Sequence, residues 1–97
     1  MPILQSVVRT PGERKEFLAK FVLDNGRSRT IRFGTPSNFA LNPSKTFADR
    51  DAYIARHRVR ENFNNPVTAG ALSRHILWGN SRNWPSNVRS FKRKFKV

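Results

Sequence analysis

The sequence has 97 residues, 19 of them Lys or Arg and 6 Asp or Glu, which gives a formal net charge of +13. A chain of this length predicts one small basic domain over residues 1–97, and its 8 Phe and 2 Trp favour a compact core over a disordered basic tail. Cysteine is absent, which excludes disulfides, thiol nucleophiles and cysteine-bound zinc. The apolar runs are too short for a membrane span and the first ten residues lack a signal-peptide pattern, so we expect neither membrane association nor secretion.

An alternation of apolar and polar side chains with a period of two predicts three strands in the first third of the chain. The expected strands run from Ile3 to Arg9, from Lys15 to Leu23 and from Arg29 to Phe33. Short connections between them favour an antiparallel meander, in which each strand pairs with the next.

The second and third strands are joined by a strong turn signal, Asp24-Asn25-Gly26-Arg27. A two-residue turn would pair Phe21 with Thr30 and leave one face of the hairpin half aromatic and half polar. A loop one residue longer or shorter gathers the large apolar side chains on one face, and burial selects that register. We therefore expect a three- or five-residue turn with Gly26 at positive φ, and a sheet with one dry face and one wet, basic face.

The segment from Gly34 to Ser44, which contains Pro36, is typical of a connecting loop. Within it, Phe39 and Leu41 are the only large apolar side chains. We expect them to anchor the loop to the core.

From Thr46 onward the apolar period is close to 3.6, which predicts three helices. The first is expected to begin with Thr46 as its N-cap, with Asp49 favourably placed near the N-terminus, and to end at about Arg60 or Glu61. Its apolar members should form a broad stripe that packs on the core: Phe47, Ala48, Ala52, Ile54, Ala55 and Val59.

The second helix is expected to start at Pro66 as its first helical residue and to stop at Gly79-Asn80. The third is expected from Trp84-Pro85 onward. Its apolar side chains recur at i, i+4, i+7 and i+11 and form one stripe of Trp84, Val88, Phe91 and Phe95. The predicted fold class is therefore α+β, an N-terminal antiparallel β-meander of about three strands followed by three helices.

The basic residues are unevenly distributed along the chain. The stretch from Asn62 to Val97 contains seven basic residues and no acidic one, so it cannot neutralise itself by internal ion pairs and should attract polyanions. A solubilising surface is the simpler explanation, but it requires less charge than this. Ten basic residues on the expected surfaces are candidate nucleic-acid contacts: Lys20 and Arg32 on the outer sheet face, Arg56, Arg58 and Arg60 on the first helix, Arg74 on the second, and Arg89, Lys92, Arg93 and Lys96 on the third.

Catalytic and metal-binding patterns are weak by comparison. The histidines, His57 and His75, are far apart in the sequence and have no cysteine to complete a zinc site. Asp49 and Asp51 point in different directions on one helix, so they do not form the paired carboxylates of a magnesium-dependent nuclease. A nuclease that uses His57 with residues 62–65 stays open, although no metal cage accompanies it. We expect a non-enzymatic protein without metal or cofactor.

Trp78 has two interpretations. Arg74 and His75 share one side of the second helix with it, and an exposed Trp beside an Arg can stack on unpaired bases. A small core also needs its large aromatic side chains, and this favours Trp78 as a core residue.

A series of motifs resembles a family of short basic proteins, without an assigned activity, that giant viruses and related large double-stranded DNA viruses of protists and algae encode. The central motif is Tyr53-Ile54-Ala55-Arg56-His57-Arg58, and Phe63 stands where the family pattern has Trp. The likeness extends over roughly residues 15–96 through Glu61-Asn62-Phe63-Asn64-Asn65-Pro66, Thr68-Ala69-Gly70-Ala71-Leu72-Ser73-Arg74, Ile76-Leu77-Trp78 and Ser90-Phe91-Lys92-Arg93-Lys94-Phe95. The resemblance implies a viral protein in the virion or in the compartment of viral genome replication.

Charge and resemblance together predict a largely sequence-independent DNA-binding protein that contacts double-stranded DNA through its phosphates, plausible in viral genome packaging or condensation. Two alternatives stay open. One is a structural virion adaptor that binds an acidic viral protein, and the other is an RNA-binding module. The sequence leaves the oligomeric state undetermined.

Overall fold

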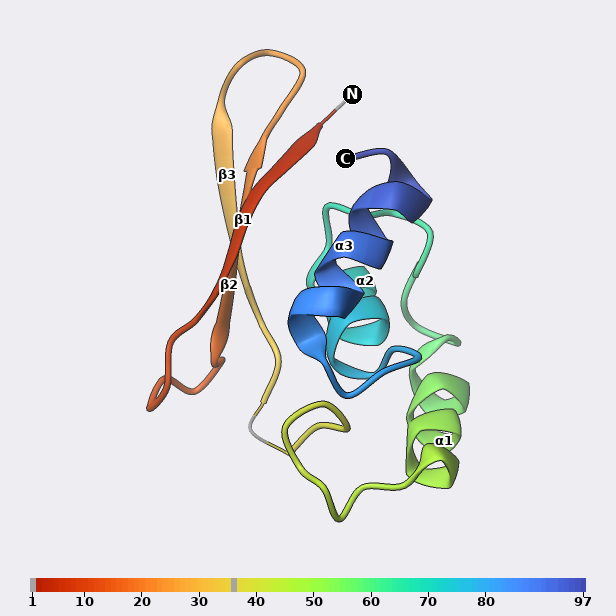
Figure 1. Cartoon of the computed structure of the whole chain (residues 1–97). Helices are drawn as coiled ribbons and strands as arrows, with labels where there is room; N and C mark the ends of the chain where they lie inside the picture. The colour runs from red at the N-terminus through yellow and green to blue at the C-terminus, as the bar shows by residue number, and fades with distance from the viewer. Residues whose placement is uncertain (1, 36) are drawn as a thin grey trace.

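The computed structural model describes residues 2–35 and 37–97, so Met1 and Pro36, which the sequence analysis placed in the first segment and in the connecting loop, lie outside the described residues. Three antiparallel strands in the order β1-β2-β3 precede the helices, which confirms the predicted α+β architecture. The helices all lie on one side of the sheet (Figure 1). The elements are β1 (Ile3–Arg9), β2 (Phe17–Val22), β3 (Ser28–Phe33), α1 (Phe47–His57), α2 (Ala69–Leu72), the π-helical turn η1 (Ser73–Leu77) and α3 (Trp84–Phe95).

The β2–β3 hairpin has the register that burial predicts. Lys20 pairs with Thr30, which places both on the outer face. The Leu23 N–H donates to the Arg27 carbonyl at 2.8 Å, so the turn contains three residues, and Gly26 adopts a φ of 81°. The prediction of a three- or five-residue turn with Gly26 at positive φ is confirmed, and the turn has three residues.

The core lies between the inner face of the sheet and the helices. Phe17 is fully buried at its centre, stacked on Phe33 at 5.5 Å between ring centroids and edge-on to Trp84 at 5.2 Å. The other fully or almost fully buried apolar side chains come from both layers: Leu4, Ala19, Phe21, Phe33, Phe39, Ala71, Leu72, Ile76, Leu77 and Phe91. The predicted stripe of α3 packs on this cluster, and so do the predicted loop anchors Phe39 and Leu41.

Helix α1 departs from prediction. It begins at the predicted cap, where the Thr46 hydroxyl accepts the Asp49 N–H at 3.1 Å and the Asp49 carboxylate accepts the Thr46 N–H at 2.8 Å. However, it ends at His57, and none of its residues, all of which the structure describes, is buried. The expected apolar stripe on the core is therefore wrong: Phe47 and Val59 are 55% and 77% exposed.

Three side chains connect α1 to the rest of the molecule: Phe47, whose ring lies 4.9 Å from that of the buried Phe39, and two residues outside the predicted stripe, Tyr53 and Arg50. Tyr53 stacks face to face on Trp78, with ring centroids 4.2 Å apart and 2° between the ring planes. Arg50 donates from Nη1 to the Gly79 carbonyl at 3.1 Å and to Asn80 Oδ1 at 3.2 Å. One aromatic ring and one long guanidinium bury more surface than a row of alanines. The alanine-rich stripe therefore does not predict which side of α1 packs on the rest of the molecule.

The second helical segment begins later than predicted. Its N-cap is Thr68, whose hydroxyl accepts the Ala71 N–H at 3.1 Å, whereas Pro66 lies in the preceding bend. Proline suits a first helical position, but a threonine hydroxyl satisfies a free backbone N–H, and here the threonine sets the start. The segment then continues into η1, where the Trp78 N–H donates to the Ser73 carbonyl at 3.0 Å, five residues back.

One basic residue of the acid-free third holds the connecting loop in place. The Arg82 guanidinium lies over the Phe39 ring at 4.1 Å. It donates to the Phe39 carbonyl at 2.7 Å, to the Asn42 carbonyl at 3.1 Å and also to the Lys45 carbonyl. Arg82 thus has a structural role, because it satisfies three backbone acceptors that no helix or strand serves.

Candidate nucleic-acid interface

The exposed surface of α3 carries the densest group of cations. Four of the predicted contact residues lie on α3 or at its C-cap, and all four are exposed: Arg89, Lys92, Arg93 and the C-cap residue Lys96. Helical periodicity places Arg89 and Arg93 away from the apolar stripe and Lys92 at its edge. Lys94 lies on the same helix and is also exposed.

These cations are not neutralised by the protein's own acids. In the described part of the chain the ion pairs join Arg9 to Glu16, Arg50 to Asp51 and His57 to Glu61. None of them involves a cation of α3. The positive charge of this helix therefore faces solvent.

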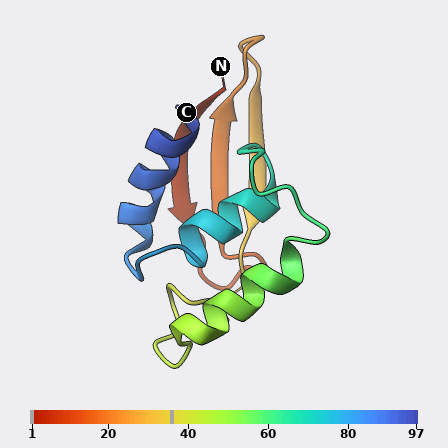
Figure 2. The ribbon, with the colours of Figure 1, turned by 90° about the vertical axis from the view of Figure 1, so that its right-hand side faces the viewer.

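The remaining predicted cations lie elsewhere. Lys20 and Arg32 are exposed on the outer face of the sheet, on the opposite side of the molecule from α3 (Figure 1). Arg56, Arg58 and Arg60 lie at the end of α1 and in the turn after it, and Figure 2 shows this end on the β3 side of the molecule, whereas α3 lies on the β1 side. The three predicted cationic surfaces are therefore separate.

The structure decides between the two interpretations of Trp78. Trp78 is only 8% exposed and its ring is covered by Tyr53, so it is a core residue and cannot receive a base. Arg74 is half-buried and donates from Nη1 to the Trp78 carbonyl at 2.9 Å. The interpretation that the sequence favoured, Trp78 as a core residue, is confirmed, and the stacking of a base on Trp78 is ruled out.

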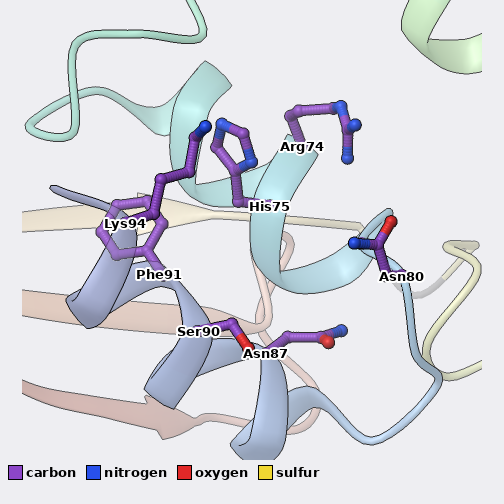
Figure 3. Close-up of a pocket in the computed structure, with 8 residues that line it drawn as sticks. Arg74, His75, Asn80, Asn87, Ser90, Phe91 and Lys94 are labelled. Atoms are coloured by element: carbon purple, nitrogen blue, oxygen red, sulfur yellow. The ribbon is translucent and has the colours of Figure 1, made fainter.

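A pocket of about 250 Å³ opens between η1 and α3 (Figure 3). Arg74 and Lys94 reach it from the two different helices, and Figure 3 shows His75 between them. None of the described residues that line it is acidic: Arg74, His75, Gly79, Asn80, Asn87, Ser90, Phe91 and Lys94. The pocket is thus an electropositive depression at the edge of the cationic helix.

The walls of the pocket are fixed by Asn87 and Gly79. Asn87 is 5% exposed, and its Nδ2 donates to the Ile76 carbonyl at 2.8 Å and to the Ser81 carbonyl at 2.6 Å, which holds the η1–α3 connection against α3. A Cβ on Gly79 would lie 2.5 Å from the His75 carbonyl oxygen and 3.0 Å from Asn87 Nδ2. Only glycine therefore fits between these two residues.

His75, which lines the pocket, is hydrogen-bonded to the segment that precedes α2. Its Nε2 lies 3.0 Å from the Phe63 carbonyl oxygen, and because a carbonyl only accepts, Nε2 carries the proton. Burial lowers the pKa of His75, and the nearby cations Arg74 and Lys94 lower it further, against the opposing effect of the hydrogen bond to Phe63. The lowered pKa favours the neutral form of the imidazole.

Lys94 is not among the contact residues that the sequence predicts, and the pocket is not predicted either. The positions Asn87, Ser90, Phe91 and Lys94 follow one another at i, i+3, i+4 and i+7, which marks one side of a helix. That signal was available, but the neighbour of this side depends on η1, whose π-helical geometry has no sequence signature.

Tyr53 is the only tyrosine of the chain, so its ionisation can be measured alone. Burial and the nearby carboxylate of Glu61 raise the pKa of Tyr53 to about 12. A phenolate absorbance titration of the folded protein should therefore have its midpoint near 12, and a titration in denaturing urea near 10. Because the folded-state pKa is raised, Tyr53 contributes stability that is present below pH 10 and is lost as the pH rises toward 12. Equal midpoints in the two titrations would contradict the Tyr53–Trp78 stacking.

Among the described residues, no group of three or more His, Asp or Glu side chains could hold a metal ion. None of the described helices is long and apolar enough to cross a membrane. Comparison of the chain with protein families, with curated proteins and with solved structures finds no match.

Proposed function

We propose that this protein is a non-enzymatic, largely sequence-independent DNA-binding protein whose main contact surface is the cationic side of α3. The observation that supports the proposal is that five cations between residues 89 and 96 are exposed and, among the described residues, none is paired with a carboxylate. Arg and Lys in such an arrangement bind phosphate oxygens, which are the same along every DNA sequence.

The dimensions of α3 agree with a duplex. From Arg89 to Lys96 an α-helix rises by about 10 Å at 1.5 Å per residue. Duplex DNA carries one phosphate charge per roughly 1.7 Å of its axis, so a length of about 10 Å contains about six phosphates, counted over both strands. Long side chains then allow each cation to reach a phosphate of its own.

A structural explanation exists for some of these residues. Lys92, Arg93 and Lys94 lie in the last turn of α3, where positive charge stabilises the helix through its dipole. Arg89 lies in the middle of the helix and gains little from this effect. Helix stabilisation therefore leaves part of the charge unexplained, and phosphate binding accounts for all of it.

Salt dependence tests the proposal directly. With about six phosphates contacted, the logarithm of the affinity for duplex DNA should fall with the logarithm of the salt concentration with a slope near −5. Duplexes of unrelated sequence should give the same slope and similar affinity, as a fluorescence-anisotropy titration can measure. An absence of binding at low salt, or an affinity that does not respond to salt, would remove the proposal.

The resemblance to short basic proteins of large DNA viruses, which rests on the sequence motifs alone, is the support for a proposed role in viral genome packaging or condensation. The partner is then double-stranded DNA, in the virion or in the compartment of viral genome replication. Single-stranded RNA as a competitor in the same titration tests the RNA-binding variant.

An adaptor function is the second candidate, and the outer face of the sheet favours it. No described helix covers this face, on which Ile3 and Val8 are 55% and 46% exposed beside Lys20 and Arg32. A mixed apolar and basic surface suits an acidic protein. Pull-down from virions after exhaustive nuclease treatment distinguishes the two, because only an adaptor keeps its partner.

A further inference from the structure

We propose that the η1–α3 pocket binds one phosphate group, held between Arg74 and Lys94. The inference deepens the proposed function, on which it rests, because the DNA backbone is the expected source of that phosphate. Its basis is a depression that cations from two helices line, rather than the charge of α3 alone.

The lining of the pocket matches the chemistry of an oxyanion. Arg74 is fixed by its bond to the Trp78 carbonyl, so little side-chain entropy is lost when it binds a ligand. Lys94 lines the pocket from α3, where its side chain extends toward His75, and Ser90 lines it one turn earlier on the same helix (Figure 3). Guanidinium, ammonium and hydroxyl groups all donate to phosphate oxygens, and none of the described lining residues is an acid that would repel them.

Burial disfavours the charge of Arg74. Burial lowers the pKa of Arg74 most and Arg50 lowers it further, whereas Asp51, which is paired with Arg50 at 3.0 Å, and Tyr53 raise it. Arg50 is itself anchored at the pocket rim on Gly79 and Asn80. A bound anion would favour the charged form of this half-buried guanidinium.

The lining of the pocket suits a phosphate better than a base. Phe91, the one phenylalanine among the described lining residues, is 1% exposed and offers no face for stacking. The cationic and polar groups around it suit a hydrated phosphate, and the rest of the nucleotide would lie outside.

The pKa of His75 should show whether an anion occupies the pocket. The groups that face it are Arg74 on its own element, Lys94 with the rings of Phe91 and Phe95 on α3, and the Phe63 carbonyl. An anion beside the imidazole favours its protonated form, so binding should raise the pKa of His75 and tighten as the pH falls. His57, on α1 and outside the pocket lining, is an internal control.

The experiment follows both imidazoles by proton NMR over pH, in inorganic phosphate and in chloride at equal ionic strength. We expect phosphate to raise the pKa of His75 by about one unit and to leave His57 unchanged. Lys94→Gln should weaken phosphate binding about fivefold, the effect of one partly exposed ionic contact. The matched control Lys15→Gln, the same loss of charge at an exposed residue of the β1–β2 connection, should not. A His75 that ignores phosphate, or a response that survives Lys94→Gln in full, overturns the proposal.

Two oligonucleotide arms identify the source of the phosphate. A duplex with dephosphorylated ends that raises the pKa of His75 shows that the backbone diester occupies the pocket. A response only to a 5′-phosphorylated strand shows that a terminal phosphate does, and the site remains a phosphate site. DNA binding without any His75 response refutes the pocket and leaves the proposed function intact. A response to inorganic phosphate without DNA binding refutes the proposed function and leaves the pocket intact.

Discussion

Replacing Gly34 by alanine is expected to lower the free energy of unfolding by about 3 kcal/mol. Gly34 follows β3 at a φ of 80°, where an L side chain costs roughly 1–2 kcal/mol. Its Cβ would also lie 2.2 Å from Leu77 Cδ1 and 3.3 Å from Phe17 Cδ2, both of which belong to fully buried side chains. Forcing an extra methyl into such a core typically costs about 1–3 kcal/mol. Sheet and helices meet at this point, so the strain would fall on the contact between the two layers.

Gly12 offers a matched control. Its φ is 88°, close to that of Gly34, but nothing lies within 4 Å of the Cβ that alanine would add. Gly12→Ala should therefore show the backbone cost alone, about 1–2 kcal/mol. Urea unfolding of both variants gives the two losses on one scale, and their difference isolates the packing cost. Equal losses would mean that Leu77 moves aside freely and that the layers are not tightly packed at Gly34.

The elements that the sequence predicts well are those with a strong local reason. The hairpin register follows from burial alone, because a shift of one residue would move Phe17 and Phe21 to the solvent side. The N-cap at Thr46 and the apolar stripe of α3 follow from spacings of a few residues. In these cases local preference and tertiary packing favour the same conformation.

The errors concern contacts between distant segments. The alanine-rich side of α1 was expected to pack on the core, but a contact between Tyr53 and Trp78 decides how the helix docks. No local sequence pattern predicts the contact between these two rings. The π-helical turn η1 is similar, because it arises where the segment must place both Leu72 and Leu77 in the core.

One part of the candidate interface can be predicted from the sequence and the other cannot. The cations of α3 are visible in the sequence, since helical periodicity separates them from the apolar stripe. The pocket is not, because it needs Arg74 from η1 and Lys94 from α3 to meet, and Asn87 to hold the connection between the helices. Sequence periodicity finds the surface of one element, whereas a site between two elements depends on their packing.

Neutralising the exposed side of α3 is expected to have the largest effect on DNA binding. The variant changes four residues to glutamine: Arg89, Lys92, Arg93 and Lys96. Each phosphate contact contributes about 0.9 to the salt slope, so the loss of four should reduce it from near −5 to about −1.5. The affinity at low salt should fall by several orders of magnitude, because each lost contact also forgoes its counterion release. Anisotropy titrations over a salt series measure both quantities.

A second variant, with the same net charge as the first, distinguishes the effect of total charge from the effect of its position. It changes four exposed cations of the strand connections and of β3 to glutamine: Arg14, Lys15, Arg27 and Arg29. If α3 is the contact surface, this variant keeps most of the slope, since only the long-range attraction is weakened. The last turn of α3 loses favourable interactions with the helix dipole in the first variant, so thermal unfolding must show that both variants are folded at the temperature of the titration. Equal loss of slope in the two would contradict a defined interface, because binding would then follow the number of positive charges and not their position on α3.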